Sequence, residues 1–142
     1  MDWYVNELKP YIDDNYPTLS DRKHTFISGS SMGGLMTLYA ISEYNDIFSR
    51  GASLSPSLSF APMAVKETLR KTRFKRNTVL YMDYGEKELP YMYAREYFGE
   101  VSEILINKNV LLTSRIVPGG KHNEESWEQA IPFFMDVLFY KL

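Results

Sequence analysis

The chain has 142 residues, of which 44% are hydrophobic and 24% are charged, and its formal net charge is −2. This length predicts a single domain over residues 1–142 with a hydrophobic core. The small net charge argues against a nucleic-acid or polyanion partner. The chain has no cysteine, which excludes disulfides, zinc–thiolate sites and thiol nucleophiles.

The first residues, Met1–Asp2–Trp3, lack the basic and apolar regions of a signal peptide. No apolar run approaches the roughly 18 residues that a membrane-spanning helix needs. These two observations predict a cytoplasmic protein without a membrane partner.

Helical and extended patterns alternate along the chain. In order, we expect a helix over 3–13, a polar turn over 15–23, a strand over 25–28, a helix over 32–44, a strand over 51–54, a helix over 61–72, a strand over 78–84, a helix over 91–107, a strand over 110–117 and a helix over 123–140. Pro10 and Pro132 lie inside the first and last helices, where proline kinks or shortens a helix. Four strands that alternate with helices predict an α/β fold, with a parallel sheet covered on both faces.

Gly29–Ser30–Ser31–Met32–Gly33 joins the first strand to the second helix and has the form G-x-S-x-G. In that motif the serine sits on a tight strand-to-helix turn that exposes its hydroxyl group. We expect each glycine to be required because a side chain at either flank would collide with the neighbouring strand and helix, and Gly34 to allow close helix–sheet packing. The motif therefore predicts Ser31 as a nucleophile and the backbone N–H of Met32 as a donor to the oxyanion.

A serine hydroxyl is a poor nucleophile at neutral pH and needs a base within hydrogen-bonding reach. The chain has two histidines. His24 precedes the strand that leads to Ser31, so we expect it at the opposite end of the sheet. His122 follows the last strand and therefore emerges at the same end as Ser31, on a loop that two glycines make pliable. His122 is the predicted base.

The base needs a carboxylate to orient it, and the third strand and the loop that follows it contain three. Asp83 still lies within the strand, whereas Glu86 and Glu88 lie past its end. We favour Glu88 as the orienting acid, with Glu86 as the alternative. Glu124 and Glu125 begin the last helix, where acidic residues complement the helix dipole.

Three segments resemble the putative esterase family of α/β-hydrolases, which includes esterase D, enterochelin esterase, tributyrin esterase and feruloyl or acetyl-xylan esterases. They are Gly-Ser-Ser-Met-Gly-Gly at 29–34, Gly-Glu-Lys-Glu at 85–88 and Gly-Gly-Lys-His-Asn-Glu-Glu-Ser-Trp at 119–127. Ser55–Pro56–Ser57 also resembles a segment of this family. The resemblance covers nearly the whole chain. It implies Ser31 as nucleophile, Glu88 as acid and His122 as base, without a cofactor or metal.

Members of this family carry a further N-terminal segment that forms strands one to four of the full fold. By this resemblance, the chain is a truncated α/β-hydrolase whose strands correspond to strands five to eight. The missing segment normally supplies the second oxyanion donor, so we expect weak activity. The first strand then becomes an unpaired edge, which predicts a homodimer or larger homo-oligomer formed through residues 25–28 or the flanking helices.

These features predict a serine hydrolase that cleaves small carboxylic esters, with short acyl or carbohydrate-linked substrates. We expect Ser30, Tyr84 and Trp127 to contact the substrate. The cluster of Tyr84, Tyr91 and Tyr93 near the acid loop either lines an acyl or sugar pocket or packs in the core. The alternative is a catalytically impaired remnant that acts as an interaction module or is completed by a partner chain. An acyltransferase that uses the same three residues is a further alternative.

Overall fold

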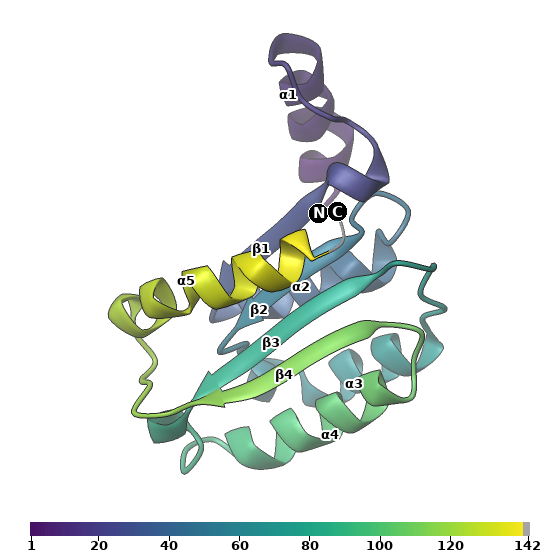
Figure 1. Cartoon of the computed structure of the whole chain (residues 1–142). Helices are drawn as coiled ribbons and strands as arrows, with labels where there is room; N and C mark the ends of the chain where they lie inside the picture. Colours follow the sequence, from purple (N-terminus) through teal and green to yellow (C-terminus); the bar gives the residue numbers. More distant parts are fainter. Residues whose placement is uncertain (141–142) are drawn as a thin grey trace.

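Four strands lie side by side in one sheet and all run in the same direction (Figure 1). The structure is a computed structural model, and it describes residues 1–140. The strands are β1 (Phe26–Ser30), β2 (Arg50–Leu54), β3 (Val79–Gly85) and β4 (Leu111–Val117), and they follow one another across the sheet in chain order. The predicted parallel α/β arrangement is confirmed.

Helices cover both faces of this sheet (Figure 1). One face carries α2 (Met32–Glu43), α3 (Pro62–Lys71) and α4 (Ala94–Ile106), and the other carries α5 (Glu124–Phe139). Among residues 1–140, no helix is long and apolar enough to cross a membrane.

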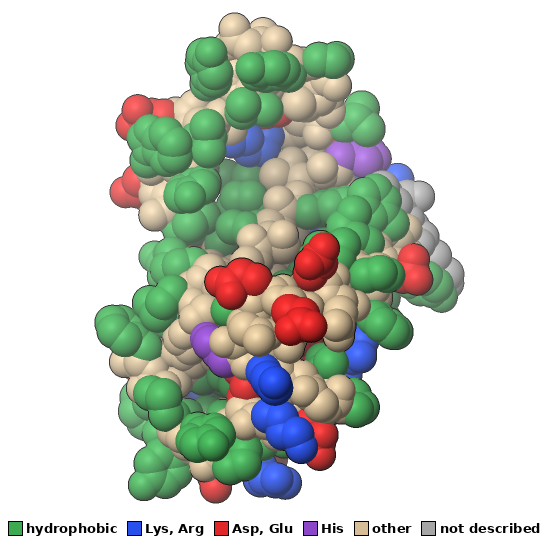
Figure 2. Space-filling model, turned by 90° about the vertical axis from the view of Figure 1, so that its left-hand side faces the viewer, with side chains coloured by type: hydrophobic (Ala, Val, Ile, Leu, Met, Phe, Trp, Pro, Cys, Tyr) green, Lys and Arg blue, Asp and Glu red, His purple; other side chains and the backbone are tan. Residues whose placement is uncertain are grey.

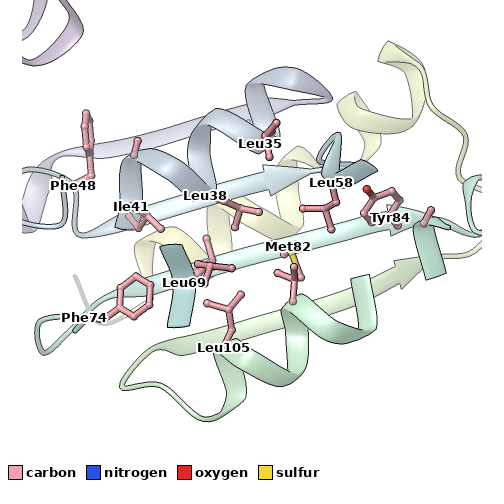
Figure 3. Packing of buried hydrophobic residues seen from close by; sticks show 14 residues of the cluster. Leu35, Leu38, Ile41, Phe48, Leu58, Leu69, Phe74, Met82, Tyr84 and Leu105 are labelled. Atoms are coloured by element: carbon pink, nitrogen blue, oxygen red, sulfur yellow. The ribbon is translucent and has the colours of Figure 1, made fainter. Parts of the chain in front are cut away.

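Since both faces are covered, every residue of β2 and β3 is buried. Met82 of β3 points to the larger core, where it packs with Leu38 of α2 and Leu105 of α4 (Figure 3). Tyr81, its neighbour in the strand, points to the opposite face and packs against Phe134 of α5. The alternation of side chains along one strand thus fixes helices to both sides of the sheet.

The N-terminal segment differs from the single helix expected over 3–13. It consists of a π-helical turn, Tyr4–Leu8, followed by α1 (Lys9–Asn15). The N–H of Lys9 bonds to the carbonyl of Tyr4, five residues back, next to Pro10, which has no N–H to donate. No residue of either element is buried, and Figure 1 shows α1 projecting away from the sheet.

Other boundaries differ from the prediction for local reasons. The polar turn ends in a short 3-10 helix, Arg22–His24, and β1 continues to Ser30 because its pairing with β2 extends that far. α4 begins at Ala94 rather than 91, because Met92 and Tyr93 adopt positive φ angles of 52° and 57°, which a right-handed helix excludes. α5 continues through Pro132 to Phe139.

All four strands end on the same side of the molecule, because the sheet is parallel. The segments that follow them, which contain Ser31, Ser55, Glu86–Glu88 and His122, therefore meet at one edge. Figure 2 shows this side of the molecule, where acidic, basic and histidine side chains gather among hydrophobic ones.

Candidate active site

Ser31 lies on the turn between β1 and α2 with φ 55° and ψ −118°, a conformation that few residues with a side chain adopt. The turn is tight enough that a Cβ on Gly29 would lie 2.6 Å from the carbonyl carbon of Gly33, and a Cβ on Gly34 would lie 2.8 Å from the carbonyl oxygen of Leu54. The expectation that Gly33 also needs to be glycine is wrong: a Cβ there meets nothing within 4 Å. Gly33 instead supplies the backbone that Gly29 must avoid.

Ser31, His122 and Glu88 form a hydrogen-bonded series. The Nε2 atom of His122 lies 2.9 Å from the Oγ atom of Ser31, and its Nδ1 atom lies 2.6 Å from Oε2 of Glu88. An ionised carboxylate only accepts, so Nδ1 carries the proton and Nε2 of the neutral ring accepts from the Ser31 hydroxyl. The three residues come from loops after β1, β3 and β4.

The position of His122 is set by close backbone packing between two loops. A Cβ on Gly85 would lie 2.4 Å from the carbonyl carbon of Gly120, and the carbonyl of Gly120 accepts from the N–H of Lys87 at 2.9 Å. Gly119 has a φ of 71°, which glycine adopts at little cost. The close approach of Gly85 and Gly120 therefore fixes the loop against its neighbour, whereas the sequence predicts only that Gly119 and Gly120 make the loop pliable.

Of the two candidate acids, Glu88 is the one that bonds to His122. Its side chain is only 7% exposed, and its second oxygen, Oε1, accepts from the N–H of Gly85 at 2.7 Å and the hydroxyl of Ser55 at 2.6 Å. Oε2 of Glu86 instead accepts from the N–H of Gly119 at 2.9 Å, which ties the two loops together.

The remaining titratable candidates make no hydrogen bond to Ser31, His122 or Glu88. His24 precedes β1 at the far end of the sheet, where its Nδ1 atom lies 2.7 Å from Oδ2 of Asp21. Asp83 is buried, and that burial raises the pKa of its carboxyl group, against hydrogen bonds that lower it. Glu124 and Glu125 lie in the first turn of α5, where they were expected.

A cavity of about 710 Å³ opens beside His122. Its lining is mainly apolar, and it consists of Met32, Pro56, Ser57, Ser59, Phe60, Tyr84, Lys87, Glu88, Tyr91, Met92, Ala94, Lys121 and His122. Tyr84 is buried and donates its hydroxyl to the carbonyl of Pro56, and burial raises its pKa above the ordinary value. Tyr91 and Met92 are 68% and 73% exposed at this cavity, whereas Tyr93 neither lines it nor packs in the core: it is 71% exposed and its ring contacts that of Tyr97.

Two residues predicted to contact substrate do not line the cavity. Ser30 is the half-buried last residue of β1. Trp127, in the first turns of α5, donates its indole N–H to the hydroxyl of Ser55 at 3.0 Å, and its ring meets that of His122 edge to face at 5.1 Å. The ring of Trp127 therefore packs against the imidazole of His122 without lining the cavity.

Sequence reasoning assigned no role to Ser55 and Ser57. The hydroxyl of Ser57 lies 3.2 Å from that of Ser31, and the hydroxyl of Ser55 contacts Glu88. The sequence position of these two serines could have indicated a role, because Ser55–Pro56–Ser57 directly follows β2 at the edge where the other candidate residues meet.

The side chains that the arrangement brings together include a hydroxyl, an imidazole and a carboxylate in one hydrogen-bonded series. Within residues 1–140, no group of three or more His, Cys, Asp or Glu side chains is placed to hold a metal ion. Met32 is the first residue of α2, where backbone N–H groups have no acceptor within the helix. This N–H lies next to Ser31 in the chain.

Known proteins share the fold of this chain. An S-formylglutathione hydrolase (FrmB) from Staphylococcus aureus matches with a TM-score of 0.70 and 19% identity, over 96% of this chain and 61% of its own. An enterochelin esterase from Shigella flexneri matches with a TM-score of 0.77 and 21% identity, over 96% of this chain and 36% of its own. At these identities the likeness establishes the fold.

A curated relative, the uncharacterized protein YbbA from Bacillus subtilis (strain 168), is 28% identical over 85 residues, which are 59% of this chain and 33% of YbbA. The chain thus spans about a third of this curated relative, and less than two thirds of the two solved structures. A family model described as "Putative esterase" matches residues 2–137, almost the whole chain. The chain therefore belongs to this esterase family.

Proposed function

We propose that the protein is a serine hydrolase that cleaves carboxylic esters, with Ser31 as the nucleophile, His122 as the general base and Glu88 as the acid that orients it. The hydrogen-bonded series from Ser31 through His122 to Glu88 carries this proposal. Membership of an esterase family and a fold shared with serine hydrolases support it.

In this mechanism, the Oγ atom of Ser31 attacks the ester carbonyl carbon while Nε2 of His122 takes the hydroxyl proton. His122 then gives that proton to the departing alcohol, which leaves the acyl group on Ser31. A water molecule, deprotonated by His122 in turn, then attacks the acyl carbonyl carbon; the bond from this carbon to Oγ of Ser31 breaks, His122 returns the proton to Oγ, and the acid leaves. Glu88 holds the imidazole in the required tautomer and stabilises its charged form throughout.

The oxyanion of the tetrahedral intermediate needs hydrogen-bond donors where its charge develops. We assign the N–H of Met32 to this role, assisted by the positive end of the α2 dipole. With this one assigned donor, we expect slow turnover, because losing one of two such donors typically lowers the rate about 10²- to 10³-fold.

The cavity supports a small ester as substrate. Its volume of about 710 Å³ and mainly apolar lining suit a short acyl chain or a carbohydrate-linked acyl group. Tyr84 and Tyr91 add aromatic rings to the lining of the cavity, and Lys87 and Lys121 add charged side chains.

Hydrolysis of p-nitrophenyl acetate by the wild type, Ser31→Ala and His122→Ala tests this proposal. We expect each substitution to lower kcat by about 10³-fold or more, because each removes a member of one catalytic unit. Ser102→Ala is the control, because it removes a serine hydroxyl on α4 that bonds only to Ser114. Equal rates for the wild type and Ser31→Ala would instead favour a non-catalytic interaction module.

A further inference from the structure

Ser55 is a buried serine at the end of β2, next to the ionisable side chains of the site. It is 2% exposed and has a φ of 41°, which is unfavourable for a residue with a side chain. Its N–H donates to the backbone carbonyl of Asp83 at 3.0 Å and lies 3.3 Å from Oδ1 of the same residue. These contacts hold the Ser55 backbone in a conformation that aims its hydroxyl at Glu88.

The direction of the hydrogen bonds around Ser55 is set by chemistry. The indole nitrogen of Trp127 can only donate, so the Oγ atom of Ser55 must accept from it. The single hydroxyl hydrogen of Ser55 then points to Oε1 of Glu88, which can only accept when ionised. Trp127 thus orients the Ser55 hydroxyl towards the carboxylate.

This arrangement also decides which oxygen of Glu88 faces His122. Oε1 accepts from both Ser55 and the N–H of Gly85, which leaves Oε2 for Nδ1 of His122. Rotation of the carboxylate would break two short hydrogen bonds in a buried position, where unpaired polar groups are costly.

Trp127 contacts the site at a second point, since its ring lies edge to face against the imidazole of His122. The start of α5 is anchored there by two hydrogen bonds: the side chain of Asn123 accepts from the N–H of Ser126, and the hydroxyl of Ser126 accepts from the N–H of Lys121. The helix therefore presents Trp127 to Ser55 and to His122 in a fixed place.

We propose that Ser55 and Trp127 are positioning residues that hold the carboxylate of Glu88 against His122. The inference rests on the proposed ester hydrolysis, in which we assign neither residue a contact with the substrate: the hydroxyl of Ser55 is buried between Glu88 and Trp127, and the indole N–H of Trp127 is used by Ser55. Their effect on catalysis is therefore expected in kcat, with KM nearly unchanged.

Three variants test the proposal by their kinetics. Ser55→Ala removes one donor from Glu88 and is expected to lower kcat about tenfold to a hundredfold. Trp127→Phe keeps an aromatic ring beside His122 but removes the N–H, and is expected to lower kcat about tenfold. If Trp127 acts through Ser55, then the double variant is no slower than Ser55→Ala alone.

Ser53→Ala is the matched control. It also removes a buried hydroxyl from β2, but this hydroxyl donates to the carbonyl of Gly34 at 2.8 Å and not to Glu88. We expect its kcat to stay close to that of the wild type. Equal losses in Ser53→Ala and Ser55→Ala would mean a purely structural role and overturn the proposal.

A second measurement works without turnover. In proton NMR spectra, the Nδ1–H of a histidine bonded to a carboxylate gives a downfield signal, which His122→Gln would identify by its loss. Ser55→Ala and Trp127→Phe are expected to shift this signal and to speed its exchange with water, whereas Ser53→Ala leaves it in place. If the wild type hydrolyses no ester but the signal responds in this way, then the proposed function fails and the positioning role stands. An unchanged signal in Ser55→Ala and Trp127→Phe overturns the positioning role.

Discussion

Ser31 and Ser55 directly follow the neighbouring strands β1 and β2, and both have positive φ angles, of 55° and 41°. Each such residue costs roughly 1–3 kcal/mol and persists only where its surroundings impose it. Here the N–H of Ser31 bonds to the carbonyl of Leu54, and the N–H of Ser55 bonds to that of Asp83, so each strand end is held by the next strand. The ladder of the sheet thereby aims two hydroxyl groups at one site.

Asp83 offers a test of pH-dependent stability at the residue scale. Burial raises the pKa of its carboxyl group above the usual 3.8, although Tyr81 and the N–H of Ser55 donate to it. Between the unfolded and folded pKa values, the folded state binds more protons, so the free energy of unfolding falls as the pH rises. Asp83→Asn cannot ionise, so the wild type is expected to lose stability relative to this variant as the pH rises from about 4 to 7. Urea unfolding at several pH values measures the difference.

Asp13 serves as the control of opposite sign. Hydrogen bonds from Lys9 and Thr18 lower the pKa of its carboxyl group, so its contribution is lost as the pH falls. The wild type should therefore gain stability relative to Asp13→Asn as the pH rises to about 4, and this difference should change little from about 4 to 7. A constant difference between the wild type and Asp83→Asn across this range would contradict the account of Asp83.

At the scale of elements, the joint between β1 and α2 decides where Ser31 lies. A Cβ on Gly34 would lie 2.8 Å from the carbonyl oxygen of Leu54 and 3.1 Å from the Cα atom of Pro56. We expect Gly34→Ala to destabilise the protein by about 1–3 kcal/mol, because helix and sheet must separate. Gly33→Ala meets no atom within 4 Å and should stabilise by about 0.4–1 kcal/mol. Urea unfolding measures both, and equal effects would refute this reading of the joint.

The order of helices and strands was predictable because segments with helical spacing of apolar residues alternate with short extended segments bounded by turn residues. The approximate site was predictable for a related reason: in a parallel sheet, residues that follow the strands meet at one edge, which brought Ser31, Glu88 and His122 together. Sequence patterns therefore predict the secondary structure of each segment and the order of the segments along the chain.

Other features depend on packing between distant segments and carry no such local pattern. The bond between Trp127 and Ser55 joins residues 72 positions apart, and it exists only because α5 lies across the face that carries β2 and β3. Met92 and Tyr93 have left-handed backbone conformations, so α4 begins only at Ala94, but neither residue type has a special preference for that conformation. The π-helical turn before Pro10 likewise could not be read from the apolar spacing of the segment.

At the scale of the whole molecule, the sheet has two outer strands, β1 and β4. β4 carries a charged residue, Arg115, which natural edge strands use to discourage pairing, whereas β1 consists of Phe-Ile-Ser-Gly-Ser and carries none. We propose that a second copy of the chain pairs along β1. This contact would pair the backbone N–H and C=O groups at the outer side of β1.

Sedimentation velocity tests this association. We expect the wild type to sediment as a dimer, and Ser28→Lys, which places a charge on β1, to sediment as a monomer. Ser114→Lys, at an exposed position on β4, should remain a dimer. A wild-type monomer at tens of micromolar, or dissociation by Ser114→Lys alone, would rule out pairing through β1.

The most direct test of the central claim is covalent labelling by a fluorophosphonate probe, read by mass spectrometry of the intact protein. Such a probe reacts with a serine only where a base activates its hydroxyl. The wild type and Ser102→Ala should each gain one adduct, on the peptide that contains Ser31, and Ser31→Ala should gain none. An unlabelled wild type, or equal labelling of Ser31→Ala, would contradict the assignment of Ser31 as an activated nucleophile.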